Sequence, residues 1–133
     1  MLRNLAAFLV GAVVCMLGNA LLLNVMMQLI PPPAGFDVNQ LESFRLLEAK
    51  HLLSPFVAHA VPSLVGALVA ALLAGSRRGR VGMSVGGLHL AGGIAAAFLV
   101  PAPWWFVVLD LSVAYLPMAY LGVALAERLR PSR

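Results

Sequence analysis

Five of the polar side chains inside the long apolar runs of this chain have types that could hold a proton or form hydrogen bonds between helices. They are Asn19, Asn24, His59, His89 and Asp110. Asp110 stands in the segment PAPWWFVVLDLSVAYLP (residues 101–117), which contains no basic residue. If such a segment crosses a membrane, an ionised carboxylate in it costs at least ~2.5 kcal/mol, so the carboxylate faces other helices and has a partner there. A histidine partner would allow either proton chemistry or a buried hydrogen bond.

Three of these side chains fall at a similar depth when residues are counted from the expected helix ends. At a rise of 1.5 Å per residue, His59, Asp110 and Asn24 lie roughly 6 to 11 Å below one membrane surface. Asn19 and His89 lie deeper, near the midplane. We therefore expect Asp110 to point into the bundle and to pair with His59, directly or through one water, with Asn24 as the best neutral substitute. Two interpretations stay open: the pair begins a proton or cation path toward His89, or it only fixes one helix against another.

Two prolines inside apolar runs add polar backbone groups near the same layer. Because proline has no N–H, Pro62 and Pro117 each leave a backbone carbonyl without its helical donor. The carbonyls concerned are those of Ala58 and Val113. Such groups could line a polar cavity, although proline kinks are also common in transmembrane helices.

Patterns typical of catalysis or metal binding are missing. The Glu48–His51 spacing occurs once, without the second carboxylate–histidine set of a two-metal site. His51 and His59 would lie about 12 Å apart along a helix, which is too far to share one metal ion. No nucleophile has a neighbouring base, and Cys15 is expected to pack as a small hydrophobic side chain. We therefore predict a protein that is not an enzyme and that holds neither metal nor cofactor.

The elements that must position these residues are apolar helices. Of the 133 residues, 62% are hydrophobic and 11% are charged, and the mean hydropathy is +0.95, as in an integral membrane protein. Apolar runs predict spans over residues 5–30, 55–74, 81–100 and 103–126, each long enough to cross a bilayer. The expected fold is all-α, a four-helix transmembrane bundle forming a single domain. Between the first two spans, residues 38–53 predict a short amphipathic helix that begins with a capping box at Asp37–Gln40.

Basic residues predict how the bundle is oriented. Seven arginines flank the spans on one side, and only Arg45 and Lys50 lie on the other. The seven are Arg3, Arg77, Arg78, Arg80, Arg128, Arg130 and Arg133. The positive-inside rule then places both termini in the cytoplasm. The same topology explains the sequence pI of about 10.2, so we do not expect nucleic acid as a partner. The first apolar run is too long for a cleaved signal peptide and is expected to remain as a helix.

Glycine and tryptophan positions predict how the helices pack. The third span carries Gly82, Gly86, Gly87, Gly92 and Gly93, and small residues allow helices to approach closely. We expect this helix to be central in the bundle or to form a homo-oligomer seam. Trp104 and Trp105 follow Pro103, where an aromatic belt at the outer membrane interface would lie.

Several short motifs resemble those of a family of small, uncharacterised bacterial four-span inner-membrane proteins. They are MLRNLAAFLVGAVV at the N-terminus, PPPAGFD after the first span, Ala58-His59, GGI (92–94), the P-x-P-W-W-F segment with Asp110, and YLPMAYLG (115–122). The motifs cover most of the chain. The resemblance implies a bundle in the bacterial inner membrane, and it supplies no substrate and no catalytic residue.

Two functions are consistent with these features. One is a small proton or cation conduit, or another transport-related protein, with Asp110 and His59 as its polar site. The other is an accessory or structural subunit of a larger membrane complex, in which the same residues serve helix packing. In either case the protein is expected to be oligomeric or part of a complex.

Overall fold

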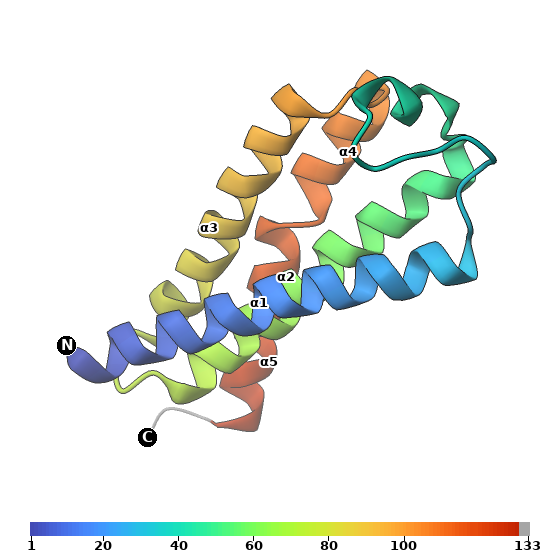
Figure 1. Cartoon of the computed structure of the whole chain (residues 1–133). Coiled ribbons are helices and arrows are strands. Elements are labelled where there is room, and N and C mark those ends of the chain that lie inside the picture. Colours follow the sequence, from blue (N-terminus) through green and yellow to red (C-terminus); the bar gives the residue numbers. More distant parts are fainter. Residues whose placement is uncertain (131–133) are drawn as a thin grey trace.

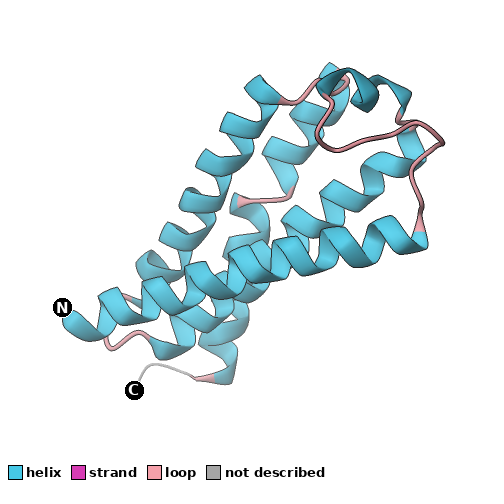
Figure 2. Ribbon diagram, viewed as in Figure 1, coloured by secondary structure: helices cyan, strands magenta, loops and turns pink. Residues whose placement is uncertain are grey.

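In a computed structural model, which describes residues 1–130, the chain is built from helices. Five α-helices occur in the order α1 (Leu2–Leu29), α2 (Leu53–Leu73), α3 (Arg78–Leu99), α4 (Trp104–Val113) and α5 (Leu116–Leu129). Two short 3₁₀ helices, η1 (Leu41–Leu46) and η2 (Ala49–Leu52), precede α2. No strand occurs within residues 1–130. The predicted all-α class is confirmed (Figures 1 and 2).

Within residues 1–130, four helical stretches are long and apolar enough to cross a membrane, which makes this an integral membrane protein. They are Leu2–Leu29, Ala49–Leu73, Arg78–Leu99 and Trp104–Leu129. Both described termini and the α2–α3 turn lie at one end of the bundle (Figure 1). We call it the arginine end, because Arg3, Arg77, Arg78, Arg80, Arg128 and Arg130 gather there; Arg133 lies outside the described residues. The opposite end, formed by residues 30–52 and 100–103, is called the loop end.

The central helix is α2, so α3 does not hold the central position that was one of the two alternatives from the glycine pattern; the other, a homodimer seam, stays a prediction. Helices α1, α3 and α5 all pack against α2, and 44% of its most apolar segment is buried, against 22% for α3. Within α3, a Cβ on Gly82 or Gly86 would overlap a side chain of α5, but Gly87 and Gly92 have no neighbour within 4 Å. One face of α3, with Gly82 and Gly86, is therefore packed inside the chain, while Gly87 and Gly92 lie on sides of the helix that face no neighbour.

The arginine end is held together by close contacts between small residues and by hydrogen bonds to helix ends. A Cβ on Gly11 would lie 2.6 Å from the carbonyl oxygen of Gly66, and one on Gly122 would collide with the carbonyl of Leu64. Beside these contacts lies a buried core of Ala67, Ala71, Ala119, Val123 and Ala126. The Arg3 Nε–H donates to the carbonyl of Leu73 at 3.0 Å. Interdigitation of small residues leaves little space between the helices here.

The loop end is organised differently, because residues 38–53 do not form the predicted amphipathic helix. The chain makes η1 and η2 instead, separated by extended backbone at Leu47 and Glu48. Nor does Asp37–Gln40 form a capping box: Asp37 accepts hydrogen bonds from the Asn39 backbone N–H at 2.9 Å and from the Gln40 side chain at 3.1 Å. The backbone hydrogen bond from Asn39 lowers the pKa of Asp37 below its ordinary value. Residues 37–40 therefore form a turn. The capping box of this region lies at η2, where it pairs Glu48 with His51.

The fourth predicted span (103–126) is broken between α4 and α5, visible in Figure 2 as a loop within the span. Tyr115 departs from helical geometry, with φ −110° and ψ −84°. Pro117 has no N–H to donate back to Val113, and it occupies the first turn of α5, where proline is well tolerated. The Val113 carbonyl therefore belongs to the end of α4 and not to a kink inside a continuous helix. The break turns Tyr115, which is fully buried, into the bundle.

Candidate polar site

Asp110 pairs with His59, as the depth count predicted. The Nδ1 atom of His59 lies 2.9 Å from Asp110 Oδ2 and 3.0 Å from Oδ1. Asp110 comes from α4 and is only 5% exposed, so it points into the bundle and not toward lipid. His59 comes from α2, and its side chain is 23% exposed. The contact joins the second predicted span to the fourth.

Tyr115 completes the surroundings of the carboxylate and was not among the predicted site residues. Its hydroxyl donates to Asp110 Oδ2 at 3.0 Å, and its ring stacks on the His59 ring with 5.3 Å between centroids. In an unbroken helix a residue five positions from Asp110 would point about 140° away. Only the α4–α5 break brings the two side chains together. Gly93 leaves room for this ring, because a Cβ there would overlap Tyr115.

His89 forms a second polar group with three side chains from α1 and α2. Its Nδ1 lies 2.8 Å from Ser63 Oγ and 3.2 Å from Cys15 Sγ, and its Nε2 lies 3.5 Å from Asn19 Nδ2. Ser63 Oγ also donates to the backbone carbonyl of His59 at 2.7 Å. Because the hydroxyl has one proton, His89 Nδ1–H then donates to Ser63, and His89 Nε2 accepts from Asn19. Ser63 was not among the predicted site residues.

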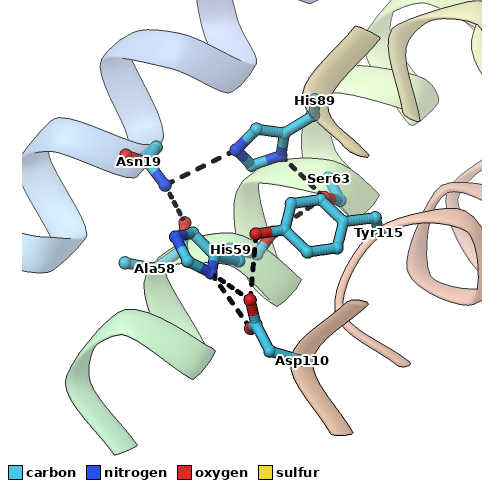
Figure 3. Close-up of polar contacts among 7 residues, drawn as sticks. All are labelled: Asn19, Ala58, His59, Ser63, His89, Asp110 and Tyr115. Atoms are coloured by element: carbon cyan, nitrogen blue, oxygen red, sulfur yellow. Dashed lines mark hydrogen bonds and ion pairs between the residues drawn. The ribbon is translucent and has the colours of Figure 1, made fainter. Parts of the chain in front are cut away.

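The backbone carbonyl of Ala58, which Pro62 leaves without its helical donor, accepts a hydrogen bond from a side chain. Asn19 Nδ2 donates to it at 2.9 Å, which replaces the missing helical donor with a side chain of α1. This bond holds α1 against α2 at the level of His59 (Figure 3).

Asn24 is not part of the site, and the prediction that placed it there is wrong. Its side chain is exposed and donates to the carbonyl of Ala20 on its own helix at 2.8 Å. The physical reason is direction: five residues along α1 rotate a side chain by about 140°, so Asn19 and Asn24 cannot face the same neighbours. Counting depth along the membrane normal does not show which way a side chain faces, and so it could not exclude Asn24.

The two polar groups form one continuous cluster, although they were predicted as separate layers. The His59 and His89 ring centroids are 5.9 Å apart, and the Tyr115 ring contacts both, at 5.3 and 5.0 Å. Figure 3 shows residues from α1, α2, α3, α4 and the α4–α5 break meeting here. We call this set, formed by Asn19, His59, Ser63, His89, Asp110 and Tyr115, the polar cluster.

Two hollows adjoin the polar cluster. A cavity of about 310 Å³ lies at the loop end and is lined by Asp110 and His59 together with apolar side chains. A groove of about 470 Å³ runs between α1 and α3 and is lined by Asn19, His89 and, again, His59. His59, Gly93 and Ala96 border both hollows. No residue within 1–130 bonds to Nε2 of His59, so this nitrogen is available for a further partner.

The remaining residues with metal-binding or interface chemistry lie apart. Across residues 1–130 no three His, Cys, Asp or Glu side chains are placed to hold a metal ion. Cys15 is buried and packs against Ala70 and Val85 as well as approaching His89. Trp104 and Trp105 begin α4 at the loop end, with 78% and 43% of their surface exposed.

Comparisons of the chain with protein-family models, with curated proteins and with solved structures find no match. The geometry of the site therefore carries the functional reasoning.

Proposed function

We propose that the protein is a non-enzymatic, transport-related membrane protein in which the His59–Asp110 pair binds a proton or another cation. The observation that supports this most strongly is the position of His59, which pairs with Asp110 through Nδ1 and borders both the loop-end cavity and the α1–α3 groove. A purely structural hydrogen bond has no need of two hollows beside it.

The chemistry of the pair suits reversible protonation. With Nδ1–H donated to the carboxylate, Nε2 of a neutral imidazole is an acceptor, and the protonated imidazolium still pairs with Asp110. Tyr115 and His59 satisfy the carboxylate in both states. The site can therefore change its charge without losing its internal hydrogen bonds.

The polar cluster extends from the loop-end cavity only as far as His89. Beyond it, toward the arginine end, the helices are packed through the alanine-rich core and the glycine contacts at Gly66, Gly82 and Gly122. This arrangement supports a binding step reached from the loop end, followed by a change in packing, rather than a permanently open pore.

The proposal is tested by flux in liposomes. Wild-type protein is expected to carry protons or a monovalent cation in response to a gradient, and Asp110→Asn is expected to abolish this flux while the protein stays folded. Glu42→Gln is the matched control, because Glu42 is an exposed carboxylate paired only with Arg45. Absence of flux in the wild-type protein, or equal flux in Asp110→Asn, would contradict the proposal.

An accessory or oligomeric role is the second candidate, favoured by one face of α3. A Cβ on Gly92 would meet nothing within 4 Å, and Leu88, one turn away on the same face, is 49% exposed. A small residue beside an apolar one is a surface on which another transmembrane helix packs closely. Gly92→Leu would then lower cross-linking between copies or co-purification with a partner. Monomeric behaviour that Gly92→Leu does not alter would contradict this role.

We further propose a bacterial inner membrane as the location, with both termini in the cytoplasm. The support is the concentration of arginines at one end of the bundle and the resemblance to small bacterial membrane proteins. A reporter fused after Arg78 should read cytoplasmic, and one inserted within residues 37–50 should read external. The reverse pattern would overturn the orientation.

A further inference from the structure

The loop-end cavity has the composition of a site for an organic cation with an apolar body. Its walls come from α1, the 31–52 loop, α2, α3 and α4, and most of the lining side chains are aliphatic or aromatic. Three phenylalanines contribute, Phe36, Phe44 and Phe106, of which the first two pack edge to face at 5.1 Å. Aromatic faces attract cations, and apolar walls bind hydrophobic groups.

The charge of the cavity favours a positive ligand. Asp110 is the one carboxylate among the residues that line it, and none of those residues is a lysine or an arginine. Within the polar cluster its partners, His59 and Tyr115, are neutral donors when His59 is unprotonated. The cavity then holds one net negative charge in an apolar surrounding, where screening by water is weak.

A second polar group in the same cavity lacks a partner. Ser54 is 3% exposed, and its Oγ is buried without a hydrogen bond to any residue within 1–130. It lines the cavity on α2, about 7.5 Å along the helix from His59. Buried hydroxyls are nearly always hydrogen-bonded, so an orphaned one in a cavity wall points to a group supplied by a ligand or water.

We propose that this cavity binds a protonated amine with an apolar body, its ammonium group against the Asp110 carboxylate and its body among the phenylalanines. The carboxylate accepts from His59 and Tyr115 and has lone pairs left for an ammonium N–H. The inference rests on the proposed function, because it names the class of cation that the His59–Asp110 pair takes.

Protons compete with this ligand. The titratable groups that face Asp110 or its histidine partner are His59 on α2, Tyr115 at the α4–α5 break and His89 on α3. Cys15 on α1 contacts His89, and His51 of η2 lines the same cavity. Protonation of His59 neutralises the net charge of the pair. Amine affinity is therefore expected to fall as the pH is lowered, by at most tenfold for each pH unit when one proton is displaced.

The test uses the full chain in zwitterionic phosphatidylcholine nanodiscs and three probes with the same apolar body. These are 4-phenylbutylamine, 4-phenylbutan-1-ol and 4-phenylbutanoate, whose binding is compared by equilibrium dialysis at neutral pH. The amine is expected to bind at least about tenfold more tightly than the alcohol, and the anion least. Equal binding of the amine and the alcohol, or preference for the anion, would overturn the inference.

Two variants and a control locate the binding. Asp110→Asn is expected to remove the preference for the amine, and its thermal unfolding is measured to show that it folds. Ala97→Phe fills the cavity from α3 without touching the pair and is expected to weaken the binding of the amine and the alcohol about tenfold or more. Glu42→Gln should bind as the wild type does. Unchanged amine binding in Ala97→Phe would place the amine elsewhere and overturn the inference.

The outcome is separable from that of the proposed function. A protein that selects the amine in dialysis but carries no proton or cation in liposomes would contradict the transport role alone. A protein that carries protons but does not distinguish the three probes would contradict the amine site alone.

Discussion

The loop-end half and the arginine-end half of this bundle solve the problem of packing helices in lipid in different ways. At the arginine end, glycines and alanines bring α1, α2, α3 and α5 into close contact, with little side-chain volume between them. Toward the loop end, α1 and α3 diverge (Figure 1), and polar side chains and hollows occupy the space. In the arginine-end half, close packing holds the helices rigidly and buries no polar cluster. In the loop-end half, hydrogen bonds between side chains fix how the helices are oriented, and the hollows leave room for a ligand.

The largest expected effect comes from crowding the closed half. Gly122→Val should destabilise the protein by about 3 kcal/mol or more, because its Cβ would overlap the Leu64 carbonyl, which belongs to the α2 backbone and cannot rotate away. Thermal unfolding in detergent measures the change. Gly92→Val is the matched control, since a Cβ on Gly92 would meet no atom of another element within 4 Å. Similar losses of stability in both variants would show that the two halves of the bundle are equally closely packed.

A smaller effect is expected from the hydrogen bond between Tyr115 and Asp110 in the open half. Tyr115→Phe keeps the buried ring and deletes the donor. It should lower the free energy of unfolding by about 1.5 kcal/mol, the lower end of the range for a hydrogen bond to a charged group. The loss should shrink when Asp110 is already replaced by asparagine. A double-mutant cycle of these two changes reports the coupling, and additive losses would show that the contact contributes nothing.

Replacing Asn19 should lower the free energy of unfolding by a smaller amount, and replacing Asn24 should hardly change it. Asn19→Ala leaves the Ala58 carbonyl without a donor and is expected to cost about 1 kcal/mol, as for other hydrogen bonds between transmembrane helices. Asn24→Ala removes only a bond to its own helix at an exposed position. Parallel unfolding measurements compare the two variants. Equal losses would mean that the open half is not organised around the freed carbonyl.

The smallest effect lies in the exposed loop. Because hydrogen bonds to Asp37 lower its pKa, the turn at residues 37–40 is stabilised above the ordinary carboxyl pKa of 3.8, and this stabilisation is lost as the pH falls through the lower, folded value. A carbon-detected NMR titration of Asp37 should show a midpoint below 3.8. A midpoint at or above that value would show that the turn does not depend on the carboxylate.

The fold class follows from hydropathy because lipid allows an open chain few other structures. An apolar run of about 20 residues must satisfy its own backbone, and the helix is the element that does so. The His59–Asp110 contact was also predictable, since Asp110 needs a donor at its own depth and the chain offers few. Both predictions depend on position along the membrane normal, which residue counting measures well.

What the sequence could not supply was direction around each helix axis. Asn24 lies at a suitable depth but faces away, and Tyr115 reaches Asp110 only because the fourth span breaks at a tyrosine two residues before a proline. Ser63 is one of several serines, and only its place beside His89 gives it a role. Residues 37–40 form a turn and not a helix start, because Asp37 accepts a hydrogen bond from the Asn39 backbone N–H, a local contact that the capping-box pattern did not indicate.

The link between His59 and Asp110 also has a consequence for how the chain is made. Its two members belong to the second and the last span, so during synthesis His59 reaches the bilayer before its partner does. Tyr115, which also bonds Asp110, lies on the last span itself, and the cluster can close only after the whole chain has been inserted. A nascent chain halted after α3 would therefore display an unpaired imidazole within the lipid, a chemical mark by which incomplete molecules differ from finished ones.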